Sequence, residues 1–265
     1  EDFAIAIPVS AYKLMDKFWP GPLTLILKSI RSGKVGLRMP DNEIALKIIK
    51  EVYDPVVMPS ANLSDNPAPK NFEEAIKDLD GKVDLAIDAG ETRLGIESSI
   101  VDLSRGEPEF IRIGAIKKEE LQEVVSRKRV VFICTGNSCR SVMAEALLKK
   151  ILQEKGRQDV EVLSAGTMML SGLSVSSGTK EVLAREGIDV STHLSQKMTR
   201  DMAHSCDLIL VMERIHEDAV IRLAQEVRNR VFLLKEFAKI NDGRPDVADP
   251  IGRSADFYEK TFLII

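Results

Sequence analysis

The sequence VVFICTGNSCRSVMAEALLKK, residues 130–150, decides the fold of the second half of the chain. Residues 130–133 are apolar and mostly β-branched, which is typical of a buried parallel strand. Residues 144–152 then repeat apolar side chains at the spacing of one helix face. Between these elements lies a turn of small residues that carries Cys134 and Arg140. The stretch therefore predicts a strand, a tight loop and a helix.

A strand-to-helix loop of this kind predicts an anion site. Its backbone N–H groups point into one hollow at the positive end of a helix, which suits a phosphate group. Arg140 can bind two phosphate oxygens, and the same field favours a nucleophilic thiolate at Cys134. Ser141 could donate its hydroxyl to that thiolate. The residues expected to bind the phosphate are Thr135, Gly136, Asn137, Ser138, Cys139 and Arg140.

The competing interpretation makes Cys134 a buried strand residue and Arg140 a surface charge. The apolar strand before the loop, the Gly-Asn turn within it and the periodic helix after it argue against that interpretation. The Gly-Lys-Ser/Thr pattern of nucleotide-binding loops is absent, so the sequence predicts a cysteine loop.

The motif CTGNSCRS at residues 134–141 resembles the signature loop of the low-molecular-weight protein phosphatases. Val142 departs from that family, which usually has proline there. We predict an α/β domain at residues 129–265, with the doubly wound parallel four-stranded sheet of this phosphatase type. The resemblance continues in SAGT (164–167), GIDVSTH (187–193), DLILVM (207–212) and DPIG (249–252). The strands are expected at residues 130–133, 160–163, 208–212 and 231–234.

The resemblance also implies a mechanism. The family places its general acid in an Asp-Pro pair on a late loop, and Asp249-Pro250 fits that pattern. Cys134 would attack phosphorus while Asp249 protonates the leaving group, and Asp249 would then activate water to hydrolyse the cysteinyl-phosphate. Arg140 and the loop amides would stabilise the phosphate oxygens. We expect this domain to need no metal and no cofactor, and to act on a phosphorylated protein.

Length and composition set broader limits. The 265 residues, 44% of them hydrophobic, suffice for two domains, and a net charge of −4 predicts no extended nucleic-acid surface. The three histidines are not spaced with the cysteines as in a metal site. Three cysteines without paired spacing, no signal peptide and no apolar run of spanning length favour a cytoplasmic protein away from membranes.

The first half of the chain predicts a mixed α/β domain at residues 1–116. Residues 117–128 are charged and helix-favouring, and we expect them to link the two domains. Strands are expected at residues 23–28, 35–38, 56–58, 84–87, 100–103 and 110–113, and helices at 43–52 and 72–79.

The first domain resembles the second half of threonylcarbamoyl-AMP synthase (YrdC-like) domains. An intact domain of that family uses ATP, threonine and bicarbonate, and the resemblance implies tRNA or double-stranded RNA as a partner. Because the family's early strand and its Lys-x-Arg pair have no counterpart here, we expect a partial domain without synthase activity. The resemblance lies in FWPGPLTLILK, VGLRMP, PSANLSDNPAP, ESSIVDL and IRIGAI. The residues it assigns to nucleotide and substrate binding are Arg38, Ser60, Asn62 and Arg112.

Three functions stay open from the sequence. A protein phosphatase could act on phosphoarginine or phosphotyrosine, and Ser138 with Ile251 and Gly252 resembles the arginine phosphatases. An arsenate reductase on the same fold needs two further cysteines after the third strand, whereas Cys206 precedes it. The third is a non-catalytic nucleotide- or RNA-binding fragment of a tRNA-modification protein.

Overall fold

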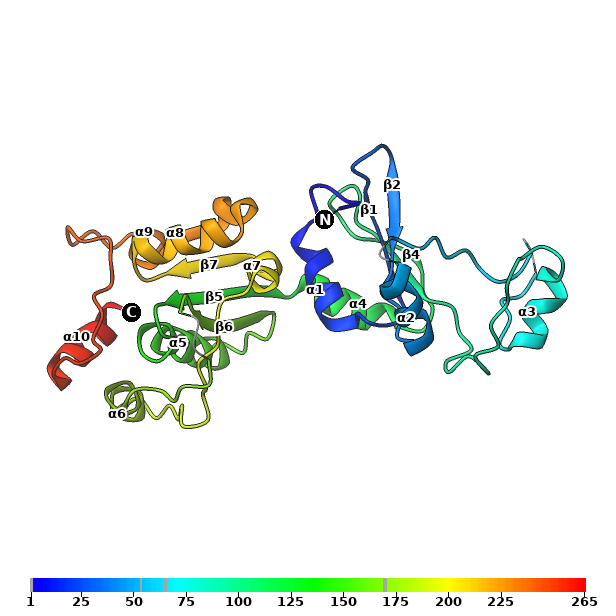
Figure 1. Ribbon diagram of the computed structural model, residues 1–265. Helices are drawn as coiled ribbons and strands as arrows, with labels where there is room; N and C mark the ends of the chain where they lie inside the picture. Colours follow the sequence, from blue (N-terminus) through cyan, green and yellow to red (C-terminus); the bar gives the residue numbers. More distant parts are fainter. Residues whose placement is uncertain (1, 53, 64–65, 169–170) are drawn as a thin grey trace. The chain divides into compact units, whose positions relative to one another are not determined.

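The computed structural model describes residues 2–52, 54–63, 66–168 and 171–265 (Figure 1). The chain divides into two compact units, Glu1–Val125 and Ser126–Ile265, and each is described here by itself. Both units are α/β, as the sequence predicts. No helix in the described ranges is long and apolar enough to cross a membrane.

The first unit contains a mixed four-stranded sheet in the order β2-β1-β3-β4. Strands β1 and β3 are parallel, and the other pairs are antiparallel. Leu23, Leu25 and Val101 are fully buried and pack with Leu14 of α1 (Val9–Phe18). The alternation of buried and less buried residues along β1 follows from the period of two in a strand with one covered face. The strands are β1 (Leu23–Lys28), β2 (Lys34–Leu37), β3 (Ser99–Asp102) and β4 (Glu109–Arg112).

Two predicted strands, at residues 56–58 and 84–87, are absent from the structure. Both stretches are unpaired, and Val57 is 91% and Leu85 78% exposed. A strand needs a neighbour for its backbone N–H and C=O groups, and the described part of the chain offers these stretches none.

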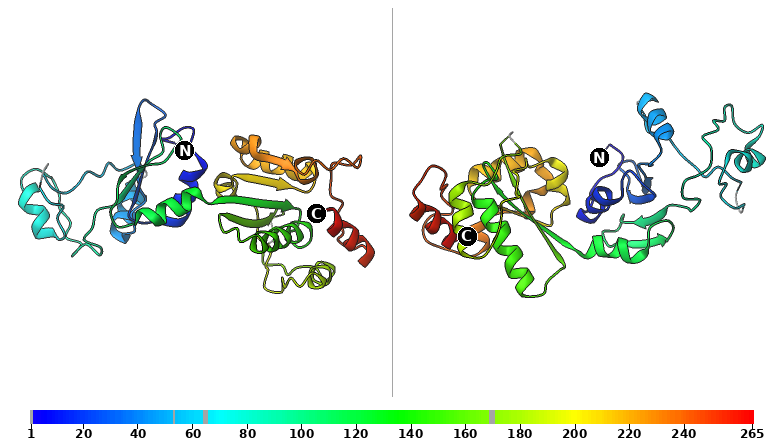
Figure 2. Two further views of the ribbon diagram at one scale, coloured as in Figure 1. Left: turned by 180° about the vertical axis from the view of Figure 1, so that it is seen from behind. Right: turned by 90° about the horizontal axis from the view of Figure 1, so that it is seen from below.

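The two predicted helices of this region form, but neither buries a side chain. They are α2 (Glu43–Val52) and α3 (Phe72–Leu79), and α3, which follows α2 and precedes β3 in the chain, lies away from the sheet (Figures 1 and 2). The sequence of this region therefore forms local helices without contributing to the core of the unit.

The segment expected to link the units is largely a helix, α4 (Lys118–Ser126). Leu121 is fully buried and packs with Val124 and Val125 against the core of the first unit. These three residues have the spacing of one apolar helix face. Because most residues around them are charged, the sequence indicates a linker and not a helix that packs on a core. The division between the units therefore falls at the end of α4.

The second unit has a fully parallel sheet in the order β6-β5-β7-β8, and all four predicted strands form. Alternate residues face opposite cores: Ile133 packs with Ile209 on one face, and Phe132 with Leu210 on the other. The strands are β5 (Lys128–Cys134), β6 (Val160–Gly166), β7 (Leu208–Val211) and β8 (Val231–Leu233). The helices are α5 (Arg140–Glu154), α6 (Ser177–Arg185), α7 (Arg200–Ser205), α8 (Arg214–Leu223), the 3-10 helix Gln225–Arg230, α9 (Leu234–Phe237) and α10 (Ala255–Ile264).

Candidate active site

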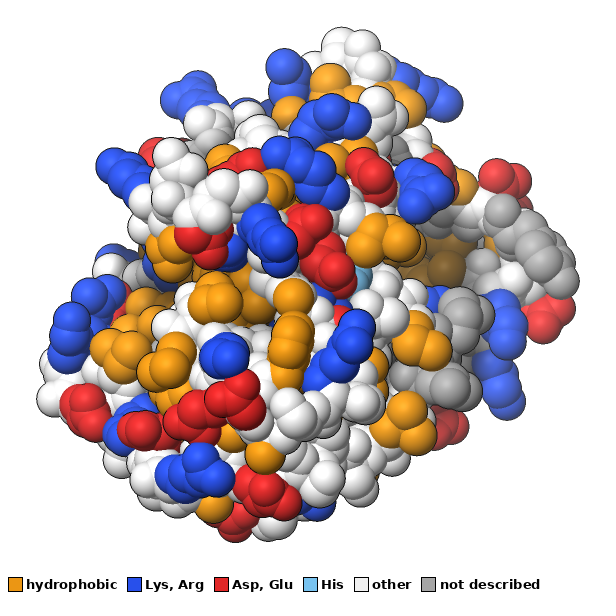
Figure 3. Space-filling view, turned by 90° about the vertical axis from the view of Figure 1, so that its left-hand side faces the viewer, with side chains coloured by type: hydrophobic (Ala, Val, Ile, Leu, Met, Phe, Trp, Pro, Cys, Tyr) orange, Lys and Arg blue, Asp and Glu red, His pale blue; other side chains and the backbone are white. Residues whose placement is uncertain are grey.

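The predicted loop lies at the carboxyl edge of the parallel sheet, where α/β proteins bind ligands. Cys134 is the last residue of β5, and Arg140 is the first residue of α5. Figure 3 views the side toward which β5 and β7 point, where basic, acidic and apolar side chains are mixed. The charge at this edge therefore comes from individual residues and not from a broad patch of one sign.

Asn137 fixes the shape of the loop. Its backbone is left-handed, with φ of 51°, a conformation that asparagine tolerates better than most residues. Its buried side chain donates hydrogen bonds to Ser141 Oγ at 3.0 Å and Ser164 Oγ at 2.7 Å, and accepts one from Gln196 N at 2.9 Å. These bonds tie the loop to α5 and to the end of β6.

The end of β6 also contacts the loop closely. A Cβ atom at Gly166 would lie 2.7 Å from the carbonyl oxygen of Thr135, so only glycine fits there. The next two residues along the chain add backbone hydrogen bonds, from Thr167 N to Cys134 O and from Met168 N to Thr135 O, each 3.0 Å long. This contact gives the SAGT motif a structural role.

Cys134 and Ser141 lie together, as predicted. Cys134 Sγ is buried and 3.0 Å from Ser141 Oγ. Because the amide group of Asn137 donates to the same Oγ, the hydroxyl proton of Ser141 is free to point toward sulfur. In this geometry the hydroxyl of Ser141 can donate to the sulfur of Cys134.

Arg140 is the most constrained cation of the site and is only 1% exposed. Its Nη1 donates to Glu213 Oε2 at 2.6 Å and to Val247 O at 2.7 Å, and its Nη2 donates to Asp249 Oδ2 at 2.6 Å. Its buried Nε has no hydrogen-bond partner among the residues described. A buried donor left unpaired is costly, so this N–H is available to an anion.

Asp249, the predicted general acid, therefore reaches the site. Its Oδ1 accepts a hydrogen bond from Ile251 N at 3.0 Å. The preceding chain is held by a bond from Val247 N to Met212 O at 2.8 Å. These contacts place the carboxyl group beside Arg140, with about a third of its side chain exposed (35%).

Two residues of the site were missed by the sequence analysis, Glu213 and His216. Glu213 is the N-cap of α8, directly after β7, and its backbone N–H donates to His216 Nδ1 at 3.1 Å. The other ring nitrogen, Nε2, lies 2.8 Å from Thr135 Oγ1. Burial, followed by the charge of Arg140, lowers the pKa of His216 to about 4, so the ring is neutral near pH 7. The available signal was topological: β7 neighbours β5, so residues after β7 must reach the loop.

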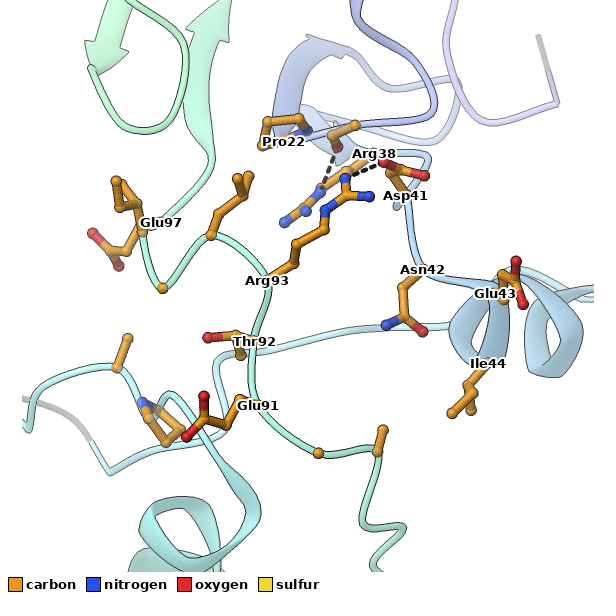
Figure 4. A pocket seen from close by; sticks show the side chains of 18 residues that line it. Pro22, Arg38, Asp41, Asn42, Glu43, Ile44, Glu91, Thr92, Arg93 and Glu97 are labelled. Carbon is orange, nitrogen blue, oxygen red and sulfur yellow. Dashed lines mark hydrogen bonds and ion pairs between the residues drawn. The ribbon is translucent and has the colours of Figure 1, made fainter.

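The predicted site residues of the first unit are only partly brought together. Arg38 lines a cavity of about 690 Å³ and donates from Nε to Gly21 O at 3.0 Å (Figure 4). Burial and the nearby charge of Arg112 lower the pKa of Arg38. Arg112 itself donates to Glu97 Oε1 at 2.8 Å. The charge of Arg112 thus acts on Arg38, and this positive charge beside the cavity suits an anion.

Ser60 and Asn62 do not line that cavity. Ser60 is exposed, and Asn62 lies in a separate hollow with Asn66 and Asp78. Asn62 Nδ2 donates to Asn66 O at 2.8 Å. The segment that carries them forms no strand and buries no described side chain, so nothing holds this turn beside the two arginines. Among the described residues, no group of three or more His, Cys, Asp or Glu is placed to hold a metal ion.

Comparison with known proteins separates the two halves of the chain. Residues 129–265 match the family model for low molecular weight phosphotyrosine protein phosphatase. Residues 1–114 match the Sua5/YciO/YrdC model, described as telomere recombination.

Curated relatives show the same division. The chain is 38% identical to a threonylcarbamoyl-AMP synthase of Pyrococcus abyssi, over 56% of this chain and 46% of the relative. It is 37% identical to a protein-arginine-phosphatase of Bacillus subtilis, over 50% of this chain and 85% of the relative. It is 34% identical to a probable low molecular weight protein-tyrosine-phosphatase, AmsI, of Erwinia amylovora, over 51% of this chain and 88% of the relative. The chain thus spans less than half of the synthase and most of each phosphatase.

Proposed function

The chain belongs to the low-molecular-weight phosphotyrosine protein phosphatase family, and from that premise we propose that it hydrolyses phosphorylated side chains of proteins through Cys134. The observation that carries the proposal is the buried, unpaired Nε–H of Arg140, on the loop that begins with Cys134. A phosphate oxygen would satisfy this donor, and the thiol of Cys134 would then lie beside phosphorus.

The proposed reaction has two steps. In the first, Cys134 Sγ forms a bond to phosphorus in line with the leaving atom, which departs with a proton from Asp249. In the second, Asp249 takes a proton from water, the water oxygen bonds to phosphorus, and the S–P bond breaks to release phosphate. Arg140 and the loop N–H groups hold the equatorial oxygens throughout, and Ser141 stabilises the departing thiolate.

We propose phosphoarginine as the preferred substrate. A guanidinium group presents several N–H donors, which the hydroxyl of Ser138 can accept. Ile251, which follows the Asp-Pro pair and is 57% exposed, offers an aliphatic wall where an aromatic residue would favour stacking on a phenyl ring. The higher identity to the protein-arginine-phosphatase of B. subtilis, 37% against 34% for the probable tyrosine phosphatase of E. amylovora, supports the same choice.

A comparison of kcat/KM on matched peptides tests this preference. The same preparation is assayed with a phosphoarginine peptide and a phosphotyrosine peptide of otherwise equal sequence. We expect the phosphoarginine value to be higher. A tenfold advantage for phosphotyrosine, about 1.4 kcal/mol in transition-state binding, would contradict it.

Arsenate reduction is disfavoured by the environment of Cys206. In such chemistry the first cysteine, once oxidised, forms a disulfide with further cysteines, whose thiols must be accessible. Cys206 is fully buried, and burial raises its pKa to about 12, so it is a thiol that resists ionisation. We therefore favour phosphate hydrolysis over arsenate reduction at Cys134.

For the first unit we propose an anion-binding role, with a nucleotide or tRNA as partner in a cytoplasmic setting. The mutual repulsion of Arg38 and Arg112 and the match to a threonylcarbamoyl-AMP synthase support this proposal. We do not expect the unit to synthesise threonylcarbamoyl-AMP from ATP, threonine and bicarbonate, because Ser60 and Asn62 lie away from the cavity that Arg38 lines. Pyrophosphate release in the presence of all three substrates would contradict this expectation.

A further inference from the structure

His216 contacts two of the residues that bind the guanidinium of Arg140, Thr135 and Glu213. Its Nε2 lies 2.8 Å from Thr135 Oγ1, and Thr135 Oγ1 in turn lies 3.5 Å from Arg140 Nη2. Its Nδ1 accepts the backbone N–H of Glu213, whose carboxylate binds Arg140 Nη1 at 2.6 Å. The ring is 1% exposed, so these contacts are shielded from water.

The hydrogen-bond partners fix the tautomer of the ring. The backbone N–H of Glu213 can only donate, so Nδ1 of His216 must be the acceptor. The single proton of the neutral ring is then on Nε2, which donates to Thr135 Oγ1. Thr135 therefore presents an oxygen whose orientation is set by His216 and which can accept from Arg140 Nη2.

We propose that His216 is a positioning residue, which aligns Arg140 for phosphate through Thr135, while its second nitrogen caps helix α8. This inference rests on the proposed phosphatase function. Arg140 donates both Nη groups to protein acceptors and keeps Nε for the ligand, so the direction of Nε depends on where those acceptors are held. A catalytic group displaced by about 1 Å can lose on the order of a hundredfold in rate.

The charges around His216 agree with a ring that works in its neutral form. Burial and then Arg140 of α5 oppose protonation, whereas Glu213 at the start of α8 and two carboxylates of the loop before α10, Asp246 and Asp249, favour it. Burial adds to the effect of Arg140 and keeps the neutral form dominant. A proton on Nδ1 would also face the N–H of Glu213 and break the cap.

Two substitutions of His216 distinguish the roles of its two ring nitrogens. In His216→Gln, the side-chain amide NH₂ can replace Nε2 as donor to Thr135, but the acceptor for Glu213 N–H is lost. In His216→Asn, the amide oxygen can replace Nδ1 as acceptor, but the shorter side chain cannot reach Thr135. Thr135→Val removes the hydroxyl and leaves the ring in place. His204→Asn, a buried histidine of α7 away from this site, controls for the loss of an imidazole.

Each variant is measured for Tm, for kcat with p-nitrophenyl phosphate and for the Kd of inorganic phosphate by calorimetry. We expect His216→Asn and Thr135→Val to lower kcat and weaken phosphate binding by about tenfold or more, with Tm nearly unchanged. His216→Gln should lower Tm yet keep kcat and the Kd of phosphate within about threefold of the parent. His204→Asn should also keep kcat and the Kd of phosphate within about threefold. Combining His216→Asn with Thr135→Val should add no further loss.

The inference is overturned if His216→Asn keeps the phosphate affinity and kcat of the parent, or if His216→Gln loses as much of both as His216→Asn does. It is also overturned if the double variant His216→Asn with Thr135→Val loses the product of the two single losses. If the His216 variants do not fold, unchanged kcat and phosphate affinity in Thr135→Val overturn the inference, because His216 is proposed to act through Thr135. Failure of the proposed function is distinct, because the parent protein would then bind phosphate without turning over p-nitrophenyl phosphate.

Discussion

Arg140 Nη2 and Asp249 Oδ2 lie 2.6 Å apart. The cation that would hold the phosphate therefore also positions the carboxyl group that would protonate the leaving group. Glu213 and Val247 bind the other Nη of the same guanidinium, so one side chain on α5 positions both the start of α8 and the loop that carries Val247 and Asp249. This arrangement requires the branched, planar geometry of arginine.

The first prediction follows from that requirement. Arg140→Lys keeps the charge but cannot bond Glu213, Asp249 and a phosphate oxygen together, so we expect kcat for p-nitrophenyl phosphate to fall by roughly a hundredfold. Arg157→Lys, at an exposed ion pair with Asp159, is the matched control and should leave kcat unchanged. Equal rates for Arg140→Lys and the control would show that the guanidinium geometry is not used.

The second prediction concerns the acid. Asp249→Ala should slow substrates with basic leaving groups by about 10²-fold or more, and p-nitrophenyl phosphate by less, because a good leaving group needs little proton donation. The measurement is kcat across aryl phosphates of graded leaving-group pKa, with Asp256→Ala, at an exposed position of α10, as control. An equal loss on every substrate would make Asp249 a structural residue of the turn.

The third prediction concerns substrate choice. Ser138→Ile places a branched aliphatic side chain in the loop and removes a hydroxyl acceptor, so the ratio of kcat/KM for phosphotyrosine over phosphoarginine peptides should rise by about tenfold. Ser32→Ile, at an exposed position of the first unit, should leave the ratio unchanged. An unaltered ratio in Ser138→Ile would remove Ser138 from the specificity argument.

The fourth prediction is a pH dependence of stability. His216 has a pKa of about 4 in the folded protein and an ordinary value near 6.5 when unfolded, so the unfolded chain binds more protons between these pH values. The free energy of unfolding should therefore fall as the pH drops from about 6.5 to about 4, by at most about 1.4 kcal/mol per pH unit from this group. Above that window His216 contributes no slope.

Urea unfolding at a series of pH values measures this slope, with His216→Gln as the comparison. The variant has no imidazole at this position, so its stability should change less steeply across the window. Parallel curves for the parent and the variant would show that His216 titrates normally in the folded protein.

Much of the second unit could be predicted from sequence because its signals are local. The apolar runs of β5 and β7 need a parallel sheet, and the loop from Cys134 to Arg140 joins consecutive elements. Glu213 and His216 could not be found in this way. Their roles depend on contacts between β7, α8 and the loop after β5, which are distant in sequence and are made by the sheet order.

In the first unit, local sequence signals predicted two strands that the structure does not contain. Residues 56–58 and 84–87 have the composition of strands, but composition does not supply a pairing partner. Ser60 and Asn62 were assigned through a resemblance, and their segment is not fixed against the sheet that carries Arg112. The strand predictions at residues 56–58 and 84–87 were therefore wrong, whereas the other four strands paired, and α2 and α3 formed with the predicted bounds.

The most direct test of the account is to trap the covalent intermediate on Cys134. The parent protein is mixed with excess phosphorylated substrate, quenched within milliseconds and analysed by peptide mass spectrometry. We predict a phosphate group on Cys134, its accumulation in Asp249→Ala when a good leaving group is used, and normal turnover in Cys206→Ser. Undiminished hydrolysis by Cys134→Ser, or turnover with no phosphate ever found on Cys134, would contradict the central claim.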